Sequence, residues 1–199
     1  MPIPLVLASG SAIRAQLLKN AGVAFSVQLP RIDEQSIKQS LIAEDISPRD
    51  IADALAEMKA GKISDKTPGS LVLGSDQVLD FDGTLLSKPQ SPDEALAQLK
   101  SMRGKRHRLF SAAVIYEDGK PVWRHVGRVT LHMRAASDAY LQGYVERNWP
   151  EIGHAVGAYM LEQEGVRLFS RIEGDYFHVL GMPLLEILEY LTVRGIIEQ

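Results

Sequence analysis

The sequence predicts a mixed α/β fold, in which a central twisted sheet carries helices on both faces. Two uninterrupted apolar runs, at residues 3–7 and 71–74, have the character of buried strands. Segments with helical caps and helical periodicity alternate with strands in the first half of the chain, whereas a hairpin dominates the middle. With 199 residues and 45% hydrophobic content, the chain can bury a sizeable core as one domain or two small lobes.

In the first half of the chain, the helix boundaries follow from their capping residues. Ser11 is suited to cap a helix over residues 12–21, and Gly22 is suited to end it. A second strand is expected at residues 23–29. Residues 48–61 predict an amphipathic helix, because apolar side chains recur there at i, i+3, i+4 and i+7: Ile51, Ala54, Leu55 and Met58.

The second half combines one strong helix start with a long hairpin. Ser91-Pro92-Asp93-Glu94 provides a cap, a proline at the first helical position and acids in the first turn, so a helix is expected to about Met102. Residues 109–116 and 122–133 predict two hairpin strands joined by residues 117–120. The remaining expected elements are a helix at 137–147, short strands at 166–172 and 177–180, and a last helix from Pro183 to about Gly195.

The composition excludes several classes of function. The chain has no cysteine, which removes disulfides, cysteine-ligated zinc and thiol catalysis. A net charge of −3 produces no long-range field for nucleic acid or an anionic membrane, so neither is expected as a partner. The N-terminal stretch carries no basic leader, and no apolar run approaches the roughly 20 residues of a membrane span. A cytoplasmic location is therefore expected.

Ser9, Ser11 and Arg14 lie at a strand-to-helix turn and together predict an anion site. Free backbone N–H groups, two hydroxyls and a guanidinium at a helix N-terminus are suited to bind a phosphate. Without an anion, a cation in the first helical turn opposes the helix dipole, typically by a few tenths of a kcal/mol. The alternative interpretation is a routinely capped helix with a solvated arginine.

Three carboxylates are candidates for metal binding or proton transfer. Asp76 is expected to close the apolar strand, and ligands bind beyond the carboxyl ends of strands in open α/β sheets. There it would hold Mg²⁺ or take a proton from water, unless it is a turn aspartate that bonds to local backbone. Asp33 and Glu34 are expected in extended chain, where at most one of them faces a given site, and solvation of both is the alternative.

Two lysines and one basic cluster are suited to phosphate contact. Lys59 lies beside the apolar stripe of its helix, and Lys88 precedes Pro89, which holds its backbone extended. Taken alone, each is equally consistent with a surface lysine. Residues 104–108, Gly-Lys-Arg-His-Arg, form a basic cluster that is more typical of a solvated connection than of a nucleic-acid patch. His107 within this cluster is a weak candidate for a phosphate contact.

The order of these signals along nearly the whole chain resembles the Maf family of nucleoside triphosphate pyrophosphatases. The matching motifs are Leu7-Ala8-Ser9-Gly10-Ser11-x-x-Arg14, Asp33-Glu34, Lys59-Ala60, Gly74-Ser75-Asp76-Gln77, Ser87-Lys88-Pro89, Gly104-Lys105-x-His107, Gly157-Ala158-Tyr159, Gly174-Asp175-Tyr176 and Val179-Leu180-Gly181-Met182-Pro183-Leu184. No single motif is specific, but a chance match of the whole ordered series is improbable.

The resemblance implies a single Maf-like domain over residues 1–199, with two lobes around a deep cleft, similar in shape to inosine-triphosphate pyrophosphatases. It implies a hydrolase that cleaves between the α and β phosphates, with a divalent metal cation (Mg, Mn or Co) as cofactor. By motif position, Asp76 is the catalytic acid or proton acceptor, and Glu34 joins it in the metal or water network. The triphosphate would be held by Ser9, Ser11, Arg14, Lys59 and Lys88. A nucleoside triphosphate is the implied partner, and a homodimer stays open.

Two branches of the family differ at positions that this sequence fills with Gln77 and Glu162. The residues Gln and Glu resemble the 7-methyl-GTP branch, whereas the dTTP/UTP branch has Thr and Gln there. A carboxylate at 162 can accept hydrogen bonds from the N1–H and amine of guanine. Ile13 matches neither branch, so a dTTP/UTP pyrophosphatase remains an alternative. A nucleotide-binding cell-division regulator with little turnover is another, although retention of Asp76 and Glu34 argues against it.

Overall fold

The computed structural model describes residues 3–198, so residues 1, 2 and 199 of the predicted single domain lie outside the described residues. The chain divides into two compact units, each described by itself. The first unit comprises residues up to 77, together with 111–127 and 181 onwards. The second comprises residues 78–110 and 128–180. Strands of the central sheet run through both units, since each of the internal unit boundaries at 77, 110 and 127 falls within a strand.

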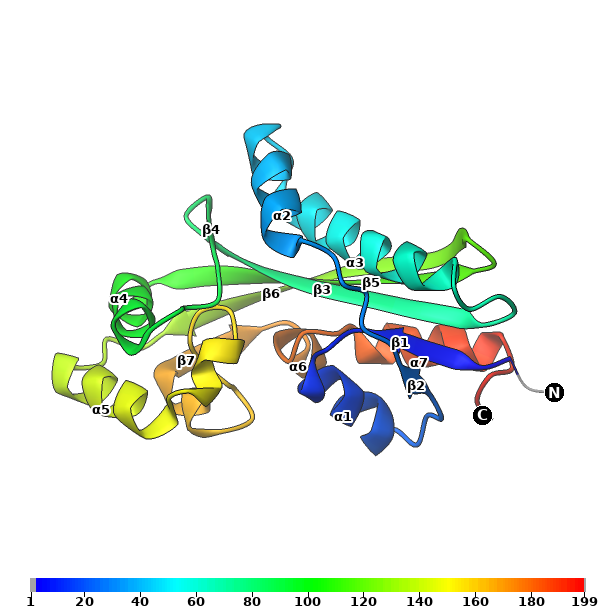
Figure 1. Ribbon diagram of the computed structural model, residues 1–199. Helices are drawn as coiled ribbons and strands as arrows, with labels where there is room; N and C mark the ends of the chain where they lie inside the picture. Colours follow the sequence, from blue (N-terminus) through cyan, green and yellow to red (C-terminus); the bar gives the residue numbers. More distant parts are fainter. Residues whose placement is uncertain (1–2, 199) are drawn as a thin grey trace. The chain divides into compact units, whose positions relative to one another are not determined.

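The sheet has seven strands in the order β2-β1-β3-β5-β6-β7, with β4 paired to β3 (Figure 1). Their bounds are β1 (Leu5–Ala8), β2 (Ser26–Val27), β3 (Leu71–Phe81), β4 (Thr84–Leu86), β5 (Arg106–Glu117), β6 (Lys120–Met133) and β7 (Phe169–Glu173). Strand β1 is parallel to β2 and β3, whereas β4 is antiparallel to β3 and β7 is antiparallel to β6. The predicted mixed α/β sheet is therefore confirmed.

Helices cover both faces of the strands in the first unit. They are α1 (Ala12–Asn20), α2 (Glu34–Ala43), α3 (Pro48–Ser64) and α7 (Leu184–Val193). Helices α2 and α3 lie on one side of β1 and β3, and α1 and α7 lie on the other (Figure 1). None of the helices in the described part of the chain is long and apolar enough to cross a membrane.

The second unit is built around a pair of contacting helices, α4 (Pro92–Met102) and α5 (Asp138–Asn148). Its other helical elements are the short helix α6 (Tyr176–Val179) and the 3₁₀ turns η1 (Glu151–His154) and η2 (Glu164–Leu168). Leu99 and Met102 of α4 and Leu141 of α5 are fully buried. The apolar faces of the two helices thus form part of this unit's core.

The capping and turn signals place most elements where the sequence predicts them. Four helices follow a serine whose side-chain oxygen accepts from the backbone N–H three residues on: Ser11, Ser47, Ser91 and Ser137. The hairpin between β5 and β6 turns at Asp118 and Gly119, whose φ angles of 47° and 76° suit a two-residue loop. Helices α1, α4 and α5 and the hairpin are confirmed to within a few residues of their predicted bounds.

Several predicted strands are wrong in length or type. Strand β2 has only two residues instead of the seven expected at 23–29. Residues 177–180 were expected as a strand, but α6 begins just before them at Tyr176, because the Asp175 side chain accepts from the backbone N–H groups of Phe177 and His178. Residues 164–168 form η2, so the expected strand at 166–172 starts only at Phe169. Helix α2 and strand β4 were not predicted.

The buried face of helix α3 includes Ile51 and Leu55 of the predicted apolar stripe but not Met58. Met58, assigned to the apolar stripe, is 44% exposed, whereas its neighbour Lys59 is 4% exposed. The buried column instead follows the i, i+4 series Ile51, Leu55, Lys59 and Ile63. The helix also continues to Ser64, beyond the predicted end at Gly61. A lysine therefore occupies a core-facing position, where an unpaired charge would be costly.

Candidate active site

Asp76 lies within strand β3 and does not end it, which corrects the sequence prediction. Pairing with β1 stops at Gly74, but β3 continues because Leu79 to Phe81 pair with β4. Successive strand residues point to opposite faces, so Gly74 and Asp76 share the face that carries α3. The carboxylate thus projects from a rigid strand and is 7% exposed.

Gly74 allows helix α3 to approach strand β3 unusually closely. A Cβ atom at this position would lie 2.2 Å from the carbonyl oxygen of Ala56 and 2.7 Å from the backbone nitrogen of Ala60. Any larger residue would therefore push the helix away from the strand. The close approach positions the helix residue between these two contacts, Lys59, against Asp76.

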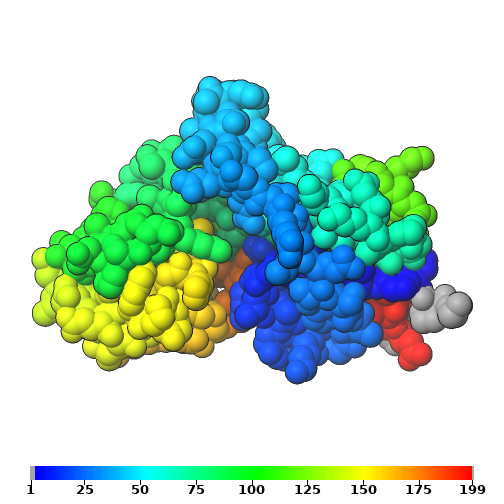
Figure 2. Space-filling view, viewed as in Figure 1, coloured from blue at the N-terminus to red at the C-terminus, as the bar shows by residue number. Residues whose placement is uncertain are grey.

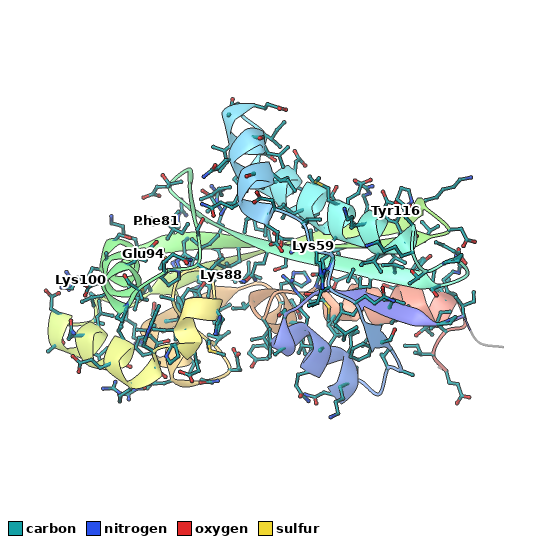
Figure 3. All side chains as sticks on the ribbon, viewed as in Figure 1. Lys59, Phe81, Lys88, Glu94, Lys100 and Tyr116 are labelled. Atoms are coloured by element: carbon teal, nitrogen blue, oxygen red, sulfur yellow. The ribbon has the colours of Figure 1, made fainter. Side chains whose placement is uncertain are left out.

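Lys59 joins two carboxylates from different elements. Its Nζ lies 2.6 Å from Oδ1 of Asp76 and 3.0 Å from Oε2 of Glu34. The side chains of Lys59 and Asp76 are 5% and 9% exposed, whereas that of Glu34 is 52% exposed. Figure 3 shows Lys59 between α3 and the strands of the sheet. One ammonium group thus neutralises a buried acid and holds a second acid at the solvent side.

Asp33 and Glu34 lie at the start of α2, and the predicted extended conformation is wrong. The Asp33 side chain accepts from the backbone N–H and the hydroxyl of Ser36, and these bonds lower the pKa of Asp33. Asp33 therefore caps the helix, which leaves Glu34 in the first turn to contact Lys59. The two adjacent acids therefore have separate roles: Asp33 caps helix α2, and Glu34 contacts Lys59.

Helix α2 brings a further cation to this region that sequence reasoning missed. None of its residues is buried, and it protrudes from the first unit in the space-filling view (Figure 2). Lys38 lies one turn after Glu34, so the two share a helix face. Partial burial lowers the pKa of Lys38, and the charge of Asp76 opposes that shift. The Asp33-x-x-Ser36 capping pattern was the available signal for this helix.

Arg14 is buried, so the interpretation as a solvated arginine is wrong. Its Nε donates to the carbonyl of Gly181 at 2.8 Å, and its Nη1 donates to the carbonyl of Ser75 at 2.8 Å. Burial lowers the pKa of Arg14, while the negative charges of Asp76 and Glu34 raise it. Its Nη2 makes no hydrogen bond within residues 3–198, so one edge of the fork stays available to an anion.

The two serines of the turn support Arg14 in different ways. The Ser9 hydroxyl accepts from Nη1 of Arg14 at 3.3 Å and from the backbone N–H of Ser11 at 3.2 Å. Ser11 is the N-cap of α1, and its hydroxyl accepts from the backbone N–H of Arg14 at 3.5 Å. The guanidinium is therefore fixed by backbone and hydroxyl oxygens before any ligand arrives.

Gly181 closes the arginine side of the site. A Cβ atom there would lie 3.4 Å from Nη2 of Arg14 and 3.8 Å from Oε1 of Gln77, and its φ of 99° disfavours other residues. Gln77 also donates from Nε2 to the hydroxyl of Ser111 at 2.9 Å. Gln77 therefore lies beside Arg14, on the strand face opposite Asp76.

The first unit thus gathers seven of the predicted residues: Ser9, Ser11, Arg14, Glu34, Lys59, Asp76 and Gln77. Lys88 and Glu162 belong to the second unit, where both are exposed outside helices and strands. His107 is 2% exposed, and its Nε2 is joined to the Tyr159 hydroxyl by a hydrogen bond of 2.8 Å. It therefore packs in the core of the second unit, and a phosphate contact by His107 stays a prediction.

Known proteins resemble this chain over nearly its whole length. Residues 4–194 match the profile of the Maf-like protein family. The chain belongs to this family. It is 69% identical over 198 residues to a nucleoside triphosphate pyrophosphatase of Ruegeria pomeroyi, with 100% of both chains covered. It is also 67% identical to the Roseobacter denitrificans protein of that name, covering 98% of each chain, and 53% identical to the Caulobacter vibrioides one, covering 96% of each.

The acidic residues of this Maf-like chain suit a divalent cation. Carboxylate oxygens are the ligands that Mg²⁺ and Mn²⁺ prefer. Oδ2 of Asp76 takes part in no ion pair or hydrogen bond within residues 3–198, and Glu34 is half exposed. Both acids contact the same nitrogen of Lys59, so their carboxylate groups flank one ammonium group. The donor set therefore fits the metal that the family resemblance implies.

Proposed function

We propose that this protein is a hydrolase that cleaves the α–β phosphoanhydride bond of a nucleoside triphosphate, releasing a monophosphate and pyrophosphate. The observation that carries the proposal is Lys59, which bridges the buried Asp76 and the half-exposed Glu34. Buried Arg14 adds a pre-oriented cation whose pKa responds to both acids. The names of the relatives, nucleoside triphosphate pyrophosphatase, support the same activity.

The cations of the site bind and orient the triphosphate. The free edge of Arg14 offers N–H groups to a phosphate, and the N-terminus of α1 at Ser11 favours negative charge. Lys59 would contact phosphate oxygens alongside its carboxylates. Such positioning and charge neutralisation supply most of the catalysis in phosphoryl transfer.

The acids would act on the attacking water. Asp76 accepts a proton from a water molecule while the oxygen of that water bonds to the α-phosphorus. At the same time, the bond from the α-phosphorus to the oxygen that bridges it to the β-phosphorus breaks. Pyrophosphate leaves with that bridging oxygen. Asp76 and Glu34 would also hold the divalent cation, which would supply charge stabilisation and lower the pKa of a bound water. The ammonium of Lys59 lies 2.6 Å from Oδ1 of Asp76 and orients this carboxylate on the strand.

We further propose 7-methyl-GTP or another modified guanosine triphosphate as the substrate. Gln77 lies beside Arg14, and Glu162 is exposed and therefore available to the N–H edge of a purine base. Glu162→Gln should lower kcat/KM for the methylated guanosine triphosphate by roughly 10- to 150-fold, with little change for UTP. Equal losses on both substrates would remove Glu162 from substrate choice and favour the dTTP/UTP alternative.

The decisive experiment for the activity is a nucleotide panel with Mg²⁺, Mn²⁺ or Co²⁺, with pyrophosphate and orthophosphate measured separately. Asp76→Asn should reduce turnover by roughly 10²-fold or more while nucleotide binding persists. Asp50→Asn, on the exposed side of α3, is the matched control and should be neutral. Nucleotide binding by the wild-type protein without pyrophosphate release would favour the cell-division regulator.

A further inference from the structure

A polar pocket of about 340 Å³ opens on the strands of the second unit. All of its lining residues belong to β3, β5, β6, β7 or the turn after β3: Asp80, Asp82, Arg106, His107, Arg108, Arg128, Thr130, His132 and Glu173. None of them is among the residues assigned above to the triphosphate or the metal. The pocket volume is within the range typical of small-ligand sites.

Strand alternation explains how the basic cluster at 104–108 contributes to this pocket. His107 packs inward against Tyr159 and Phe169, with ring centroids 5.6 Å and 5.9 Å away. Its neighbours Arg106 and Arg108 therefore project from the opposite face of β5. On β6, the lining residues Arg128, Thr130 and His132 follow the same two-residue spacing. Neighbouring strands thus present arginines toward one space, on a rigid scaffold.

The pocket is lined by three arginines and three carboxylates, and ion pairs engage some of them with each other or with Arg171 outside the pocket. Asp80 is 2% exposed and contacts Nη2 of Arg108 at 2.6 Å. Glu173 contacts His132 at 2.9 Å and Arg171 at 3.1 Å.

Of the remaining charged lining residues, Arg106 and Arg128 form no ion pair within residues 3–198. Among the lining acids, Asp82 likewise forms no ion pair within residues 3–198. Two free guanidinium groups therefore face one free carboxylate, which favours an anionic ligand with a group that Asp82 can accept from.

We propose that this pocket is a second anion site, which binds a phosphate-bearing anion of pyrophosphate or mononucleotide size between Arg106 and Arg128. Arg106 and Arg128 lie on neighbouring strands, and each guanidinium group can donate two N–H groups to a tetrahedral phosphate. The Thr130 hydroxyl adds a neutral donor between them. A mononucleotide would additionally place a sugar hydroxyl or base amine against Asp82, which inorganic pyrophosphate cannot do.

The test is an NMR titration of metal-free ¹⁵N-labelled protein with inorganic pyrophosphate and, separately, with a nucleoside monophosphate. The arginine Nε–Hε signals of Arg106 and Arg128 and the backbone amides of Thr130 and His132 should shift saturably. The double variant Arg106→Gln, Arg128→Gln should weaken the affinity reported by the Thr130 and His132 amides at least about tenfold. Asp82→Asn should change the affinity only for the monophosphate if the nucleotide is the better ligand.

The matched control is the double variant Arg134→Gln, Arg167→Gln, which removes the same charge from exposed positions of the second unit outside the pocket. It should leave the shifts and the affinity unchanged. Shifts confined to residues around Arg14 and Lys59 would mean that phosphates bind only at the candidate active site, and this would overturn the proposal. An equal loss of affinity in both double variants would also overturn it, because a general charge effect would then explain the binding. Neither outcome bears on the proposed hydrolysis.

Discussion

Nζ of Lys59 lies 2.6 Å from Oδ1 of Asp76, and both side chains are almost completely buried. The contact joins the inner face of helix α3 to the middle of strand β3. It exists because Gly74 lets the helix approach the strand and because Lys59 occupies the core-facing column of the helix. Since Glu34 contacts the same ammonium, the pair also links α2 to the sheet. Changes at Lys59 or Gly74 should therefore affect both the stability of the protein and its activity.

Replacing Lys59 by methionine should abolish most of the activity. Methionine preserves the length and packing of the side chain but leaves Asp76 buried without its partner, at a cost of about 3–5 kcal/mol in unfolding free energy. We expect kcat/KM to fall by roughly 10²-fold or more. Lys62→Met, an exposed lysine on the same helix, is the control for losing a charge from α3. Near-normal kcat/KM in a folded Lys59→Met protein would show that the ion pair is only structural.

Gly74→Ala should separate α3 from β3 and thereby weaken the site without touching a charged residue. The added Cβ clashes with Ala56 and Ala60, and overpacking of this kind costs about 1–3 kcal/mol. Gly61→Ala is a matched control on helix α3, which packs against Gly74. A Cβ atom at position 61 would make an ordinary contact of 3.5 Å with Tyr116. The control should be neutral or slightly stabilising. Urea unfolding and kcat/KM for both variants check this, and full activity of Gly74→Ala would contradict it.

Arg14→Lys should impair the site although the positive charge is kept. A lysine cannot donate at the same time to the carbonyls of Gly181 and Ser75 and still offer a free edge to a phosphate. We expect KM to rise and kcat/KM to fall by about tenfold or more, together with a loss of about 1–3 kcal/mol in stability. Arg49→Lys, at an exposed position of α3, serves as the control. Unchanged KM for Arg14→Lys would argue that the guanidinium fork does not contact substrate.

His107 should make the protein less stable in mild acid. Burial, with a smaller contribution from His132, lowers the pKa of His107 to about 4, whereas an unfolded histidine titrates near 6.5. Between these two pKa values the unfolded chain binds a proton that the folded protein does not, so the unfolding free energy falls as pH decreases through this window. The contribution of His107 is at most about 3 kcal/mol.

Urea unfolding at about pH 7 and about pH 5 would measure this dependence, with His107→Gln as the comparison. Glutamine can still bond to the Tyr159 hydroxyl but does not titrate. The variant should therefore lose less stability than the wild type on acidification. An identical pH dependence in both proteins would contradict the inward, neutral state of His107.

The part of the fold that could be predicted is the part encoded by local chemistry. Serine caps, the Ser91-Pro92 helix start and the Asp118-Gly119 turn act within a few residues, and each is found where the sequence places it. The strand expected at 177–180 is wrong because the Asp175 side chain caps a helix there, and this local hydrogen bonding outweighs the apolar pattern that predicted a strand. Local hydrogen bonding thus explains both the successes and this error.

The geometry of the site depends on tertiary packing, so it was harder to predict from the sequence than the helix caps and turns. Helix α2 buries no residue, so it lacks the apolar periodicity that reveals a helix, and Lys38 was missed with it. The length of β3 is set by pairing with β4 beyond Asp76, which no local signal indicates. The sequence nevertheless selected Lys59, Asp76 and Glu34, which the structure brings into contact, and their roles toward a triphosphate and its cation stay predictions.

Hydrolysis of the substrate in ¹⁸O-labelled water tests the central claim most directly. If Asp76 delivers water to the α-phosphorus, mass spectrometry should find the label in the nucleoside monophosphate and none in pyrophosphate. Asp76→Asn should slow the appearance of label without changing where it goes. Label in pyrophosphate would place the attack at the β-phosphorus, and release of a nucleoside diphosphate with labelled orthophosphate would place it at the γ-phosphorus. Either result would contradict attack at the α-phosphorus by a water that Asp76 activates.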